Sequence, residues 1–475
     1  MKFDSKVQYL KYRVLAEIAR LSWTDNLLEN VTEIPKIISP GKTPTMRCCV
    51  YKERAILSER MKHAIGGNRY SRKVIQVIDI ACEDCPAGGY EVTSACRGCL
   101  AHRCEDACKK GAIVIGHDQK AYIDKSKCVE CGMCAKACPY NAIYNFKRPC
   151  EQSCKVKAIS MGKDKEAVID YASCIACGAC AYTCPFGAIT DRSYILDVID
   201  ILLKSEGGRN YKTYALIAPS IAGQFTDGTL LQVVSAIKAL GFDEVVEVAL
   251  GADMVALNEA KELEEKGFLL SSCCPAFVSY VEQNFPAFKQ NISTNLSPAG
   301  TLARHIKQGD KNCRTVFIGP CTAKKTEFQR PEYAGLIDSV LTFEELQALF
   351  GSRDIEISTL PETPLNGASP CGRKFARSGG VAEAVKAALR EQGSDFEVKA
   401  VSCSGVEEIR SALLKKSRGA LDVNFIEGMA CVGGCIGGAG CLTHGDKNKA
   451  AVDSYGDEAE HATISAAVNA AEKLR

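Results

Sequence analysis

Short apolar runs alternate with helical stretches over residues 191–475 of this 475-residue chain. The runs that are typical of strands are YALIAPSI, DEVVEVAL, GFLLSS, RTVFIGP, SVLTF and FEVKAVS. This alternation predicts α/β layers around a largely parallel sheet. Several runs end in a cysteine or a proline just before a helix, and ligands in such folds gather at the carboxyl ends of strands. We therefore expect these cysteines to converge.

The first 80 residues (1–80) form a leader segment before the first cysteine cluster. The run DSKVQYLKYRVLAEIARL has the apolar periodicity of a helix. RKVIQVIDIAC is typical of a strand that leads to Cys82, and Cys48 and Cys49 fall in a loop between these two elements. We interpret both loop cysteines as ordinary thiols.

Residues 82–190 contain an internal repeat, in which the phrase C-xxx-C-xxx-A-I occurs four times. The four copies are CEDACKKGAI, CAKACPYNAI, CEQSCKVKAI and CAYTCPFGAI. A repeat of this kind predicts stacked copies of one small unit. The chain between the copies offers little apolar surface, so we expect this region to need metal to fold. The predicted fold is an α+β cysteine-rich region followed by an α/β domain.

Composition narrows the classes of protein that the chain can belong to. The chain has 59 basic and 57 acidic residues, a balance that gives no reason to expect nucleic acid or an anionic membrane as a partner. No apolar run reaches the roughly 18 residues needed to span a bilayer, and the charged N-terminus lacks the core of a signal peptide. We expect a cytoplasmic protein. Of its 27 cysteines, sixteen fall between Cys82 and Cys184, which favours metal binding over disulfides.

Two of the repeats, CVECGMCAKACP and CIACGACAYTCP, match the spacing CxxCxxCxxxCP. This spacing lets three thiolates cap one face of a [4Fe–4S] cubane while the fourth crosses to a partner cluster, as in ferredoxins. A zinc ribbon, the alternative, needs only two CxxC pairs. We assign Cys128, Cys131, Cys134 and Cys184 to one cluster, and Cys174, Cys177, Cys180 and Cys138 to another.

The other two repeats are incomplete. CRGCLAHRCEDAC has two extra residues in its middle, and CEQSC lacks its leading CxxC, which CEDC could replace. With the same crossover, sixteen thiolates would hold four cubanes and form an electron wire. His102 is a rival ligand, and a zinc site in place of one cubane stays open. The predicted sets are Cys96, Cys99 and Cys104 with Cys154, and Cys82, Cys85 and Cys150 with Cys108.

Three segments of the C-terminal domain carry further cysteines: SSCCPAFV (271–278), IGPCTAKKTE (318–327) and EGMACVGGCIGGAG (427–440). The last is rich in glycine, which lets backbone approach a bulky cofactor closely. It lacks the GK[ST] ending of a phosphate-binding loop. Together the three segments resemble the signature motifs of the [FeFe]-hydrogenases, most of all the group B type. The resemblance covers roughly residues 82–475, ferredoxin repeats included.

The resemblance implies an H-cluster, which is a [4Fe–4S] cubane joined to a diiron centre with CO, cyanide and azadithiolate ligands. By the motif register, Cys274, Cys321 and Cys431 hold the cubane, and Cys435 also bridges to the diiron unit. Lys324 would donate a hydrogen bond to a cyanide, because a buried anionic ligand needs a partner. A solvated surface lysine is the alternative. The pocket-lining positions are Ala218, Pro219, Ser220, Phe375 and Met429.

The resemblance also implies a path for protons. Cys273, next to the ligand Cys274, would exchange a proton with the bridge amine, since a thiol with a pKa near 8.5 can give and accept one. The resemblance also places Glu259, Glu262 and Ser293 on this path, with Lys266 near the point where protons would reach the surface. The two glutamates are three residues apart on a predicted helix and share a face. The alternative is a solvated acidic helix face.

The chain departs from well-studied members of this family at several positions. Gly319 stands where they have methionine, Ala299 where they have glutamine, and Phe277 where they have tryptophan. GAGCLTH replaces the usual GGGQP ending and brings in Cys441. These changes predict a roomier and less polar pocket, and they leave catalytic bias and oxygen tolerance open.

These features predict a ferredoxin-dependent [FeFe]-hydrogenase that catalyses 2H⁺ + 2e⁻ ⇌ H₂. Its predicted partners are H₂, protons, ferredoxin or a similar small electron carrier, and the proteins that mature the diiron centre. Two alternatives stay open, namely a hydrogenase-like iron–sulfur assembly factor and a hydrogen sensor. We interpret Cys371 and Cys403 as core thiols. The electron partner, the direction of turnover and the oligomeric state stay open.

Overall fold

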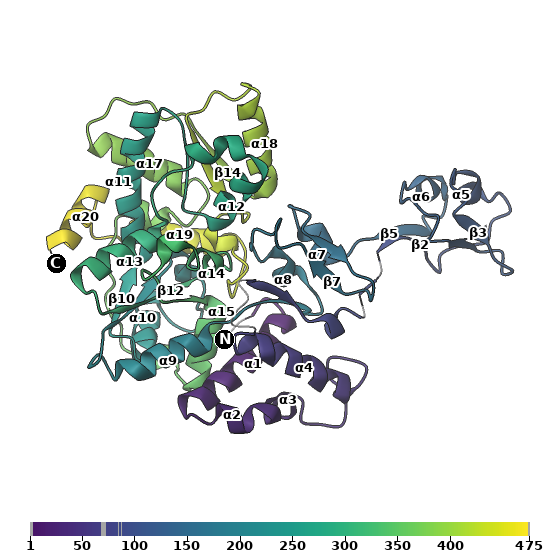
Figure 1. Ribbon diagram of the computed structural model, residues 1–475, viewed down its shortest axis with the longest axis horizontal. Coiled ribbons are helices and arrows are strands. Elements are labelled where there is room, and N and C mark those ends of the chain that lie inside the picture. The colour runs from purple at the N-terminus through teal and green to yellow at the C-terminus, as the bar shows by residue number, and fades with distance from the viewer. Residues whose placement is uncertain (1–2, 68–72, 84, 87, 474–475) are drawn as a thin grey trace.

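The structure is a computed structural model that describes residues 3–67, 73–83, 85–86 and 88–473. Figure 1 shows an α/β body, a group of N-terminal helices against its lower edge and a slender arm that projects to the right. No helix among these described residues is both long and apolar enough to cross a membrane.

A four-stranded parallel sheet, in the order β10–β9–β12–β13, forms one half of the α/β body. Among the helices that share its hydrophobic core are the four named below, two of which begin with a threonine capping box: Thr229 with Gln232, and Thr342 with Glu345. The strands are β9 Thr213–Ile217, β10 Glu244–Glu247, β12 Arg314–Gly319 and β13 Ser339–Thr342, and the helices are α9 Ile195–Ser205, α10 Leu230–Ala239, α13 Pro298–Gly309 and α15 Phe343–Ser352.

A second parallel sheet, in the order β11–β15–β14, forms the other half. The parallel α/β arrangement predicted from the sequence is confirmed, but its central strand, β15, was not among the predicted runs. Glu427 interrupts that strand with a charge, which is buried because it accepts hydrogen bonds from Gly379, Ala382 and Ser402. The strands are β11 Leu269–Leu270, β14 Ala400–Ser404 and β15 Phe425–Met429.

Two predicted strands are shorter than expected. In DEVVEVAL the chain turns into helix α11, Val248–Lys266, directly after β10, and FEVKAVS becomes a strand only from Ala400. Helix α11 packs against α13, α16, α17 and α20 and ends at Gly267, whose φ of 70° suits glycine. The remaining helices of the body are α12 Pro275–Asn284, α14 Lys324–Glu327, α16 Pro370–Lys374, α17 Gly380–Glu391, α18 Val406–Ser417, α19 Asp446–Asp457 and α20 Ile464–Lys473, with 3₁₀ turns η3 Pro219–Gly223, η4 Pro286–Asn291, η5 Pro331–Tyr333, η6 Ile357–Thr359 and η7 Cys435–Gly437.

The N-terminal helices are built onto this body. Helix α1 packs along α15, and its residues Val14, Leu15 and Ile18 belong to the same core as the four-stranded sheet. Cys48 and Cys49 are exposed in the loop before α4, as expected. The elements are α1 Lys6–Trp23, α2 Leu27–Asn30, η1 Val31–Glu33, α3 Ile34–Ile38 and α4 Val50–Ala64.

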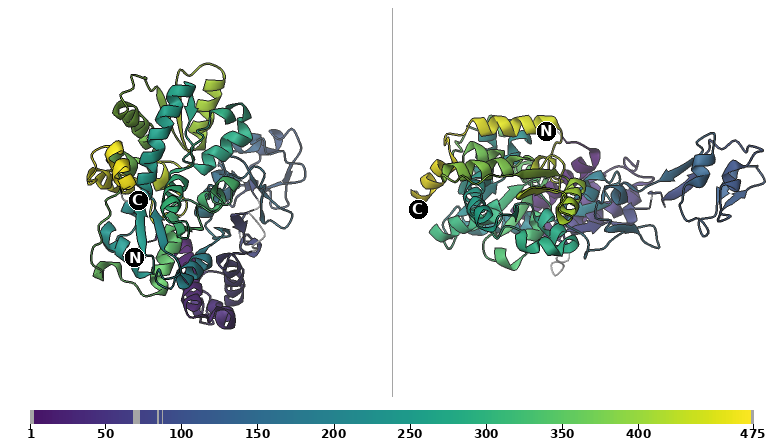
Figure 2. Two further views of the ribbon diagram at one scale, coloured as in Figure 1. Left: turned by 60° about the vertical axis from the view of Figure 1, so that its left-hand side comes forward. Right: turned by 90° about the horizontal axis from the view of Figure 1, so that it is seen from above.

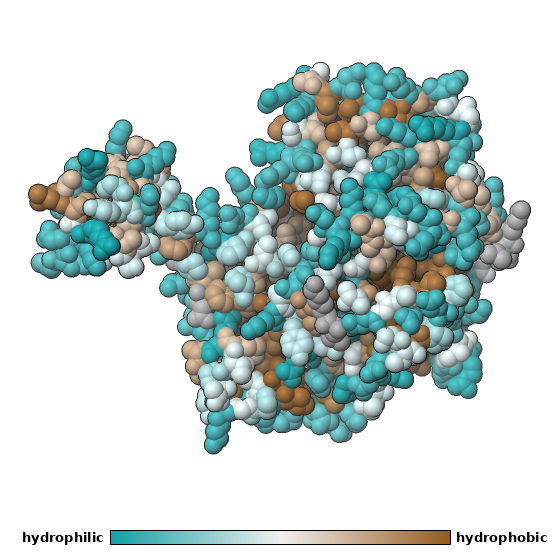
Figure 3. Space-filling model, turned by 180° about the vertical axis from the view of Figure 1, so that it is seen from behind, coloured by the Kyte–Doolittle hydropathy of each residue, from teal (hydrophilic) through white to brown (hydrophobic). Residues whose placement is uncertain are grey.

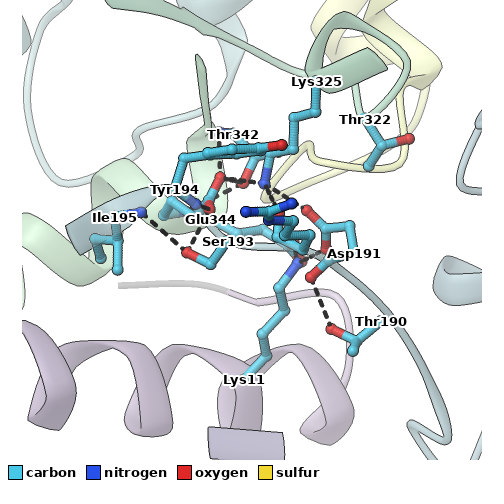
Figure 4. A network of polar contacts seen from close by, with 12 residues as sticks. Lys11, Thr190, Asp191, Ser193, Tyr194, Ile195, Thr322, Lys325, Thr342 and Glu344 are labelled. Atoms are coloured by element: carbon cyan, nitrogen blue, oxygen red, sulfur yellow. Dashed lines mark hydrogen bonds and ion pairs between the residues drawn. The ribbon is translucent and has the colours of Figure 1, made fainter. Parts of the chain in front are cut away.

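A buried network of charges joins three parts of the chain (Figure 4). Lys11 of α1 contacts Asp191, and its Nζ lies 2.6 Å from the Oε2 of Glu344 in α15. The Nζ of Lys325, which is fully buried, lies 2.7 Å from a carboxylate oxygen of Asp191 and 2.7 Å from one of Glu345. Since buried charges need partners, this network ties the N-terminal helices and the cysteine-rich region to the body.

The cysteine-rich region consists of two small modules, one inserted in the other. The inner module (residues 73–83, 85–86 and 147–191) lies against the body. The arm (residues 88–146) leaves it through the strand pair β2 and β5 and stands apart from the rest of the surface (Figures 2 and 3).

Every strand pair in this region is antiparallel. The inner module contains β1 Ile75–Val77, η2 Asp79–Ala81, α7 Pro149–Ser153, β6 Ile159–Met161, β7 Ala167–Ile169, α8 Ala179–Thr183 and β8 Ile189–Asp191. The arm contains β2 Gly89–Val92, α5 Arg103–Asp106, β3 Ile113–Ile115, β4 Ala121–Ile123, α6 Met133–Ala137 and β5 Ile143–Phe146. In the residues that the structure describes, β1 pairs with β8, and the whole arm lies between these two strands in the sequence.

Candidate functional site

The carboxyl ends of the two parallel sheets open into one buried cavity. Cys273 and Cys274 follow β11, Cys321 follows β12, and Cys431 and Cys435 follow β15, and all five line the cavity. The convergence predicted from the sequence is therefore confirmed. It results from parallel strands, whose carboxyl ends meet at one edge of a sheet.

Glycines let the loop after β15 fold back tightly. Gly434 has a φ of 90°, and a Cβ there would lie 2.7 Å from the backbone nitrogen of Ser378 and 2.8 Å from the carbonyl of Ala376. A Cβ on Gly438 would lie 2.5 Å from the carbonyl of Pro320. In this structure the close approaches of these two glycines are to neighbouring backbone, and they hold Cys435 against the segment that carries Cys321.

Cys273 leads from the cavity to a buried glutamate. Burial raises the pKa of Cys273 well above its ordinary value, and the nearby Glu259 adds to this. Glu259 is fully buried in α11, and its Oε1 accepts a hydrogen bond of 3.3 Å from the backbone N–H of Ser272. Its Oε2 has no hydrogen-bond partner among the described residues. Burial raises the pKa of Glu259 to about 7, so this carboxyl can hold or release a proton near neutrality.

A second glutamate continues from this point to the surface. Ser293 lies between Glu259 and Glu262 and donates a hydrogen bond of 2.9 Å to Glu262 Oε2. Lys266 Nζ lies 2.6 Å from Glu262 Oε1. Burial opposes the charge on Glu262, but hydrogen bonds from Lys266, Thr294 and Ser293 outweigh it and lower its pKa. Side-chain exposure rises to 10% at Glu262 and 34% at Lys266, so the two glutamates are not a solvated helix face.

Lys324 lines the cavity and is buried, which excludes the alternative of a solvated surface lysine. Its Nζ donates hydrogen bonds of 2.6 Å to Ser297 Oγ and to Glu327 Oε2. Burial works against its charge, but Glu327 and Tyr333 outweigh this and raise its pKa. Ser297 and Glu327 are not part of the predicted site, although Glu327 lies three residues after Lys324, a spacing that places both side chains on one face of a helix.

The remaining predicted pocket positions also come together. Ala218, Pro219, Phe375 and Met429 all line the cavity. Ser220 is fully buried beside them in η3, and its Oγ has no hydrogen-bond partner within the described ranges. A buried hydroxyl without a partner is costly, so Ser220 is suited to a polar group that is not part of the chain.

At Gly319 a neighbouring side chain fills the space that the glycine leaves. A Cβ on Gly319 would lie 2.5 Å from the ring of Phe317, which takes up the space and itself lines the cavity. Ala299 does line the cavity. Phe277 is fully buried against Gly428, where a Cβ would meet its ring at 2.3 Å.

Other cysteines and the histidine that the sequence singled out lie away from the cavity. Cys441 is buried, and its thiol faces the carbonyl of Ile436 at 3.5 Å. Cys403 is buried in β14, and Cys371 is partly buried against the core beside α11. His102 is half-buried, and its Nδ1 lies 3.3 Å from Glu105.

The predicted pairing of the accessory cysteines between repeats is wrong. Each module keeps its own eight cysteines, because the arm stands away from the inner module. Cys184 lies near Cys82 and Cys150, whose pKa values are raised chiefly by burial and also by Cys184. Cys138 lies near Cys104, and Cys108 near Cys134. The structure therefore groups Cys82, Cys85, Cys150 and Cys184; Cys154, Cys174, Cys177 and Cys180; Cys96, Cys99, Cys104 and Cys138; and Cys108, Cys128, Cys131 and Cys134.

The inner module meets the cavity at Cys177. Cys177 is near enough to Cys274 and Cys431 for their charges to affect one another. Thr322, which follows Cys321, donates a hydrogen bond of 2.7 Å to the carbonyl of Ala176. This contact brings one accessory group of cysteines beside the cavity thiols.

The donor set of the cavity fits an iron–sulfur cubane. Four thiols face one volume, and burial raises the pKa values of Cys321 and Cys435 to about 12, so these thiols resist ionisation on their own. Iron binding would drive their deprotonation, since the thiolate is the ligand. Ser220, with its unpartnered hydroxyl, and Lys324 would be available to a larger polar group beside the cubane.

Comparisons with known families match this arrangement. Residues 211–439 match the family "Iron only hydrogenase large subunit, C-terminal domain". Residues 121–144 and 167–190 match the 4Fe-4S binding domain. The chain therefore contains 4Fe-4S binding motifs followed by a domain of the iron-only hydrogenase type.

Individual relatives agree with these matches. Iron hydrogenase 1 of Clostridium pasteurianum is 31% identical over 257 residues, which are 44% of this chain and 45% of that protein. Cytosolic Fe-S cluster assembly factor NAR1 of Botryotinia fuckeliana is 32% identical over 142 residues, 26% of this chain and 25% of that protein. The matches span about half the length of the first hydrogenase relatives, from 45% to 63%.

A solved structure gives the same fold. A variant of the [FeFe]-hydrogenase HydA1 from Chlamydomonas reinhardtii superimposes with a TM-score of 0.50 at 22% identity, over 59% of this chain and 93% of that one. Together with the cysteine cavity, these matches show that the chain carries 4Fe-4S binding motifs followed by a domain similar to that of iron-only hydrogenases.

Proposed function

We propose that this chain is an [FeFe]-hydrogenase that interconverts two protons and two electrons with H₂. The observation that carries the proposal is the cavity itself. Four buried thiols meet there beside Cys273, from which buried acid groups lead to the surface, and an accessory group of cysteines lies next to it. A redox reaction of protons needs all three components in one place.

The cofactor of this proposal is an H-cluster. Cys274, Cys321 and Cys431 would hold the cubane, and Cys435 would also bridge to the diiron centre. When bound, that centre supplies a Lewis-acidic iron and a basic bridge amine, which split and form H₂. Ser297 and Glu327 hold the ammonium group of Lys324, which would lie beside the anionic ligands of the diiron centre.

Within the protein, protons would move along the buried acid groups. Cys273 would exchange a proton with the cofactor, and Glu259, whose unpartnered Oε2 has room for a proton, would take it from Cys273. Ser293 would pass it to Glu262, to which it is hydrogen-bonded. Lys266 marks the end of the path at the surface. A general acid with a pKa near the working pH is the most effective one, and Glu259 meets this condition.

Electrons would arrive through four accessory [4Fe–4S] clusters, from the arm through the inner module to the cavity. The partner would be ferredoxin or a similar small carrier, and separate maturation proteins would insert the diiron unit. We place the protein in the cytoplasm, with no role for nucleic acid or a membrane.

A second candidate function is iron–sulfur cluster assembly without a diiron centre. The similarity to the assembly factor NAR1, at an identity close to that of the hydrogenase relatives, favours it. In that case the cavity would hold a cubane alone. A hydrogen sensor would share the H-cluster but show little turnover.

An infrared spectrum of the matured protein, recorded beside a hydrogen-evolution assay, tests the proposal. We expect CO and cyanide stretching bands together with turnover. In Cys435→Ala we expect both to disappear, while the iron of the other clusters remains. Before maturation, five cubanes predict about 20 irons per chain, at four irons each. If bands never appear after maturation, the assembly function replaces the proposal; if bands appear without turnover, the sensor does.

A further inference from the structure

Arg148 is buried beside three cysteines of the inner module. It is 1% exposed and directly precedes Pro149 and Cys150 at the start of α7. Its Nε donates toward the Sγ of Cys85 at 3.5 Å. The rest of its guanidinium donates to the carbonyls of Lys165 at 2.9 Å and Glu166 at 3.4 Å. Cys82 and Cys150 also lie near its guanidinium.

Arg60, from helix α4, is buried on the side of the fourth cysteine. It is 3% exposed, and its Nη2 donates a hydrogen bond of 2.6 Å to the carbonyl of Gly187. Its Nε has no hydrogen-bond partner in the described part of the chain. Burial lowers the pKa of Arg60 to about 10, and the charge of Cys184 opposes that shift. Cys184 is therefore close enough to act on this guanidinium.

Neither arginine forms an ion pair with a carboxylate of any residue that the structure describes. Glu151 is affected by the charge of Arg148 but makes no ion pair with it. Buried charges in proteins are paired or bound to metal sites, because an isolated charge is strongly disfavoured there. Two buried guanidinium groups around four thiols therefore lack a counter-charge that the protein itself supplies.

We propose that Arg60 and Arg148 are the counter-ions of a cubane held by Cys82, Cys85, Cys150 and Cys184, and that they give it the highest reduction potential among the accessory clusters. The inference rests on the cluster content of the proposed function. A cubane with four thiolates is anionic, and it gains one further negative charge when it accepts an electron from the carrier. Nearby cations and N–H···S hydrogen bonds stabilise the reduced form and raise the potential.

The arm offers a matched contrast. Arg97 and Arg103 lie beside Cys96, Cys99, Cys104 and Cys138, but both side chains are exposed. Water and salt screen exposed charges, so these two arginines affect their cluster far less. Cys85 and Cys150 of the cluster with the buried arginines flank in sequence the strand pair through which the arm leaves, whereas Cys177 of the neighbouring group lies beside the cavity thiols. The cluster with the buried arginines would hold one electron while the carrier delivers the next.

Redox titration of the iron-loaded full chain, followed by electron paramagnetic resonance, tests this assignment. In the parent we expect one cluster to be reduced before the others. In Arg148→Gln and in Arg60→Gln, its one-electron equilibrium should shift toward the oxidised form by about tenfold or more, which equals a fall of about 59 mV. Arg148→Lys should keep most of the parent potential. The exposed control Arg103→Gln should leave every cluster within a small fraction of that shift.

Iron content is measured first in each variant. If Arg148→Gln and Arg60→Gln bind the full iron and the first-reduced cluster keeps its potential, the inference is overturned. If Arg148→Gln loses four irons while Arg148→Lys keeps them, the role as counter-ion is supported. If the parent itself lacks a cubane at these four cysteines, both the inference and the predicted cluster count fail. Normal infrared bands and turnover in that protein would still leave the hydrogenase proposal standing.

Discussion

The arm and the α/β body both gather cysteines, but they do so by different means. In the arm, the main cluster of buried apolar side chains among the described residues is small and contains Ile113, Ala121, Ile143 and the cysteine Cys134. In the body, large cores on two parallel sheets hold strand ends in place, and the cysteines follow those ends. The arm's site needs its metal in order to exist, whereas the body provides a cavity in which a metal can be placed.

Individual thiols differ within the arm as well as between the arm and the body, since burial raises the pKa of Cys104 and Cys134 in the arm. Cys108 in the arm accepts hydrogen bonds from backbone amides, chiefly that of Ala112, and these lower its pKa. Burial in the body raises the pKa of Cys321 to about 12. A thiol on an exposed loop is thus ready to bind iron as it folds. A buried thiol gives up its proton only when a cluster arrives.

Removal of iron should produce the largest difference in stability between the arm and the body. A structural metal contributes about 10–16 kcal/mol in small metal-dependent domains, which matches or exceeds the total stability of most domains. After chelation we expect backbone amides of residues 88–146 to exchange with solvent as in an unfolded chain. Amides of β9 and β12 should stay protected. Hydrogen exchange read by mass spectrometry measures the protection of both sets of amides. Protection that persists in the arm would show that the arm does not need metal to stay folded.

Replacing Cys273 should separate binding from catalysis in the body. If Cys273 is the first proton relay, Cys273→Ala should lower turnover by about 10²–10⁴-fold, the range for loss of a positioned acid–base group. Its iron content and its CO and cyanide bands should not change. Aspartate, which titrates and has similar reach, should restore part of the rate, and serine should restore little.

Cys313→Ala is the control for this change, because Cys313 is also a buried thiol of the body but does not line the cavity. It should cost stability and leave turnover nearly unchanged. Near-normal turnover in Cys273→Ala would mean that protons leave by another route.

Glu259 gives the stability of the body a dependence on pH below neutrality. Its pKa is raised from 4.5 to about 7, so its contribution to stability is present below pH 4.5 and is lost as the pH rises to 7. At 1.36 kcal/mol per pKa unit, the loss is about 3 kcal/mol. Glu259→Gln, which stays neutral, should gain stability over the parent by up to this amount between pH 4.5 and pH 8.

Urea unfolding of the parent and of Glu259→Gln between pH 4.5 and pH 8 measures the difference between their free energies of unfolding. The control is Glu265→Gln, an exposed position on the same helix. The difference between its free energy of unfolding and that of the parent should stay nearly constant with pH. An equally constant difference for Glu259→Gln would show that Glu259 is ionised throughout this range.

The smallest expected effect is a difference in stability between alanine variants of two glycines that have left-handed backbone conformations. One glycine lies where the inner module meets the body, and the other lies in the arm. A Cβ on Gly178, where φ is 76°, would lie 2.6 Å from both Ala439 Cβ and Thr322 Oγ1, whereas Gly111, where φ is 58°, has open space. Both alanine variants should cost about 1–2 kcal/mol of backbone strain. Gly178→Ala should cost about 1–3 kcal/mol more through overpacking.

The difference should appear as faster amide exchange at Thr322 and Ala439, next to the cavity. Equal effects for the two glycines would mean that the inner module does not press on the body at Gly178.

The sequence predicted the parallel sheets and the convergence of Cys274, Cys321, Cys431 and Cys435 because strand order and motif position carry that information. It missed β15 because the buried Glu427 breaks the apolar run, and its partners come from distant segments. It also missed the grouping of the accessory cysteines. All four repeats share the phrase C-xxx-C-xxx-A-I, so this common spacing cannot say which repeat folds with which.

The arm begins and ends at one place, since Gly89 at its start is paired with Phe146 at its end. The gene segment for residues 88–146 could therefore be lost or gained in a single event, without redirecting the chain on either side of it. The inner module would keep both of its own cysteine groups, and the body would keep its contact through Cys177. Lineages could thus lengthen or shorten the electron path of such a protein without altering the site where it ends.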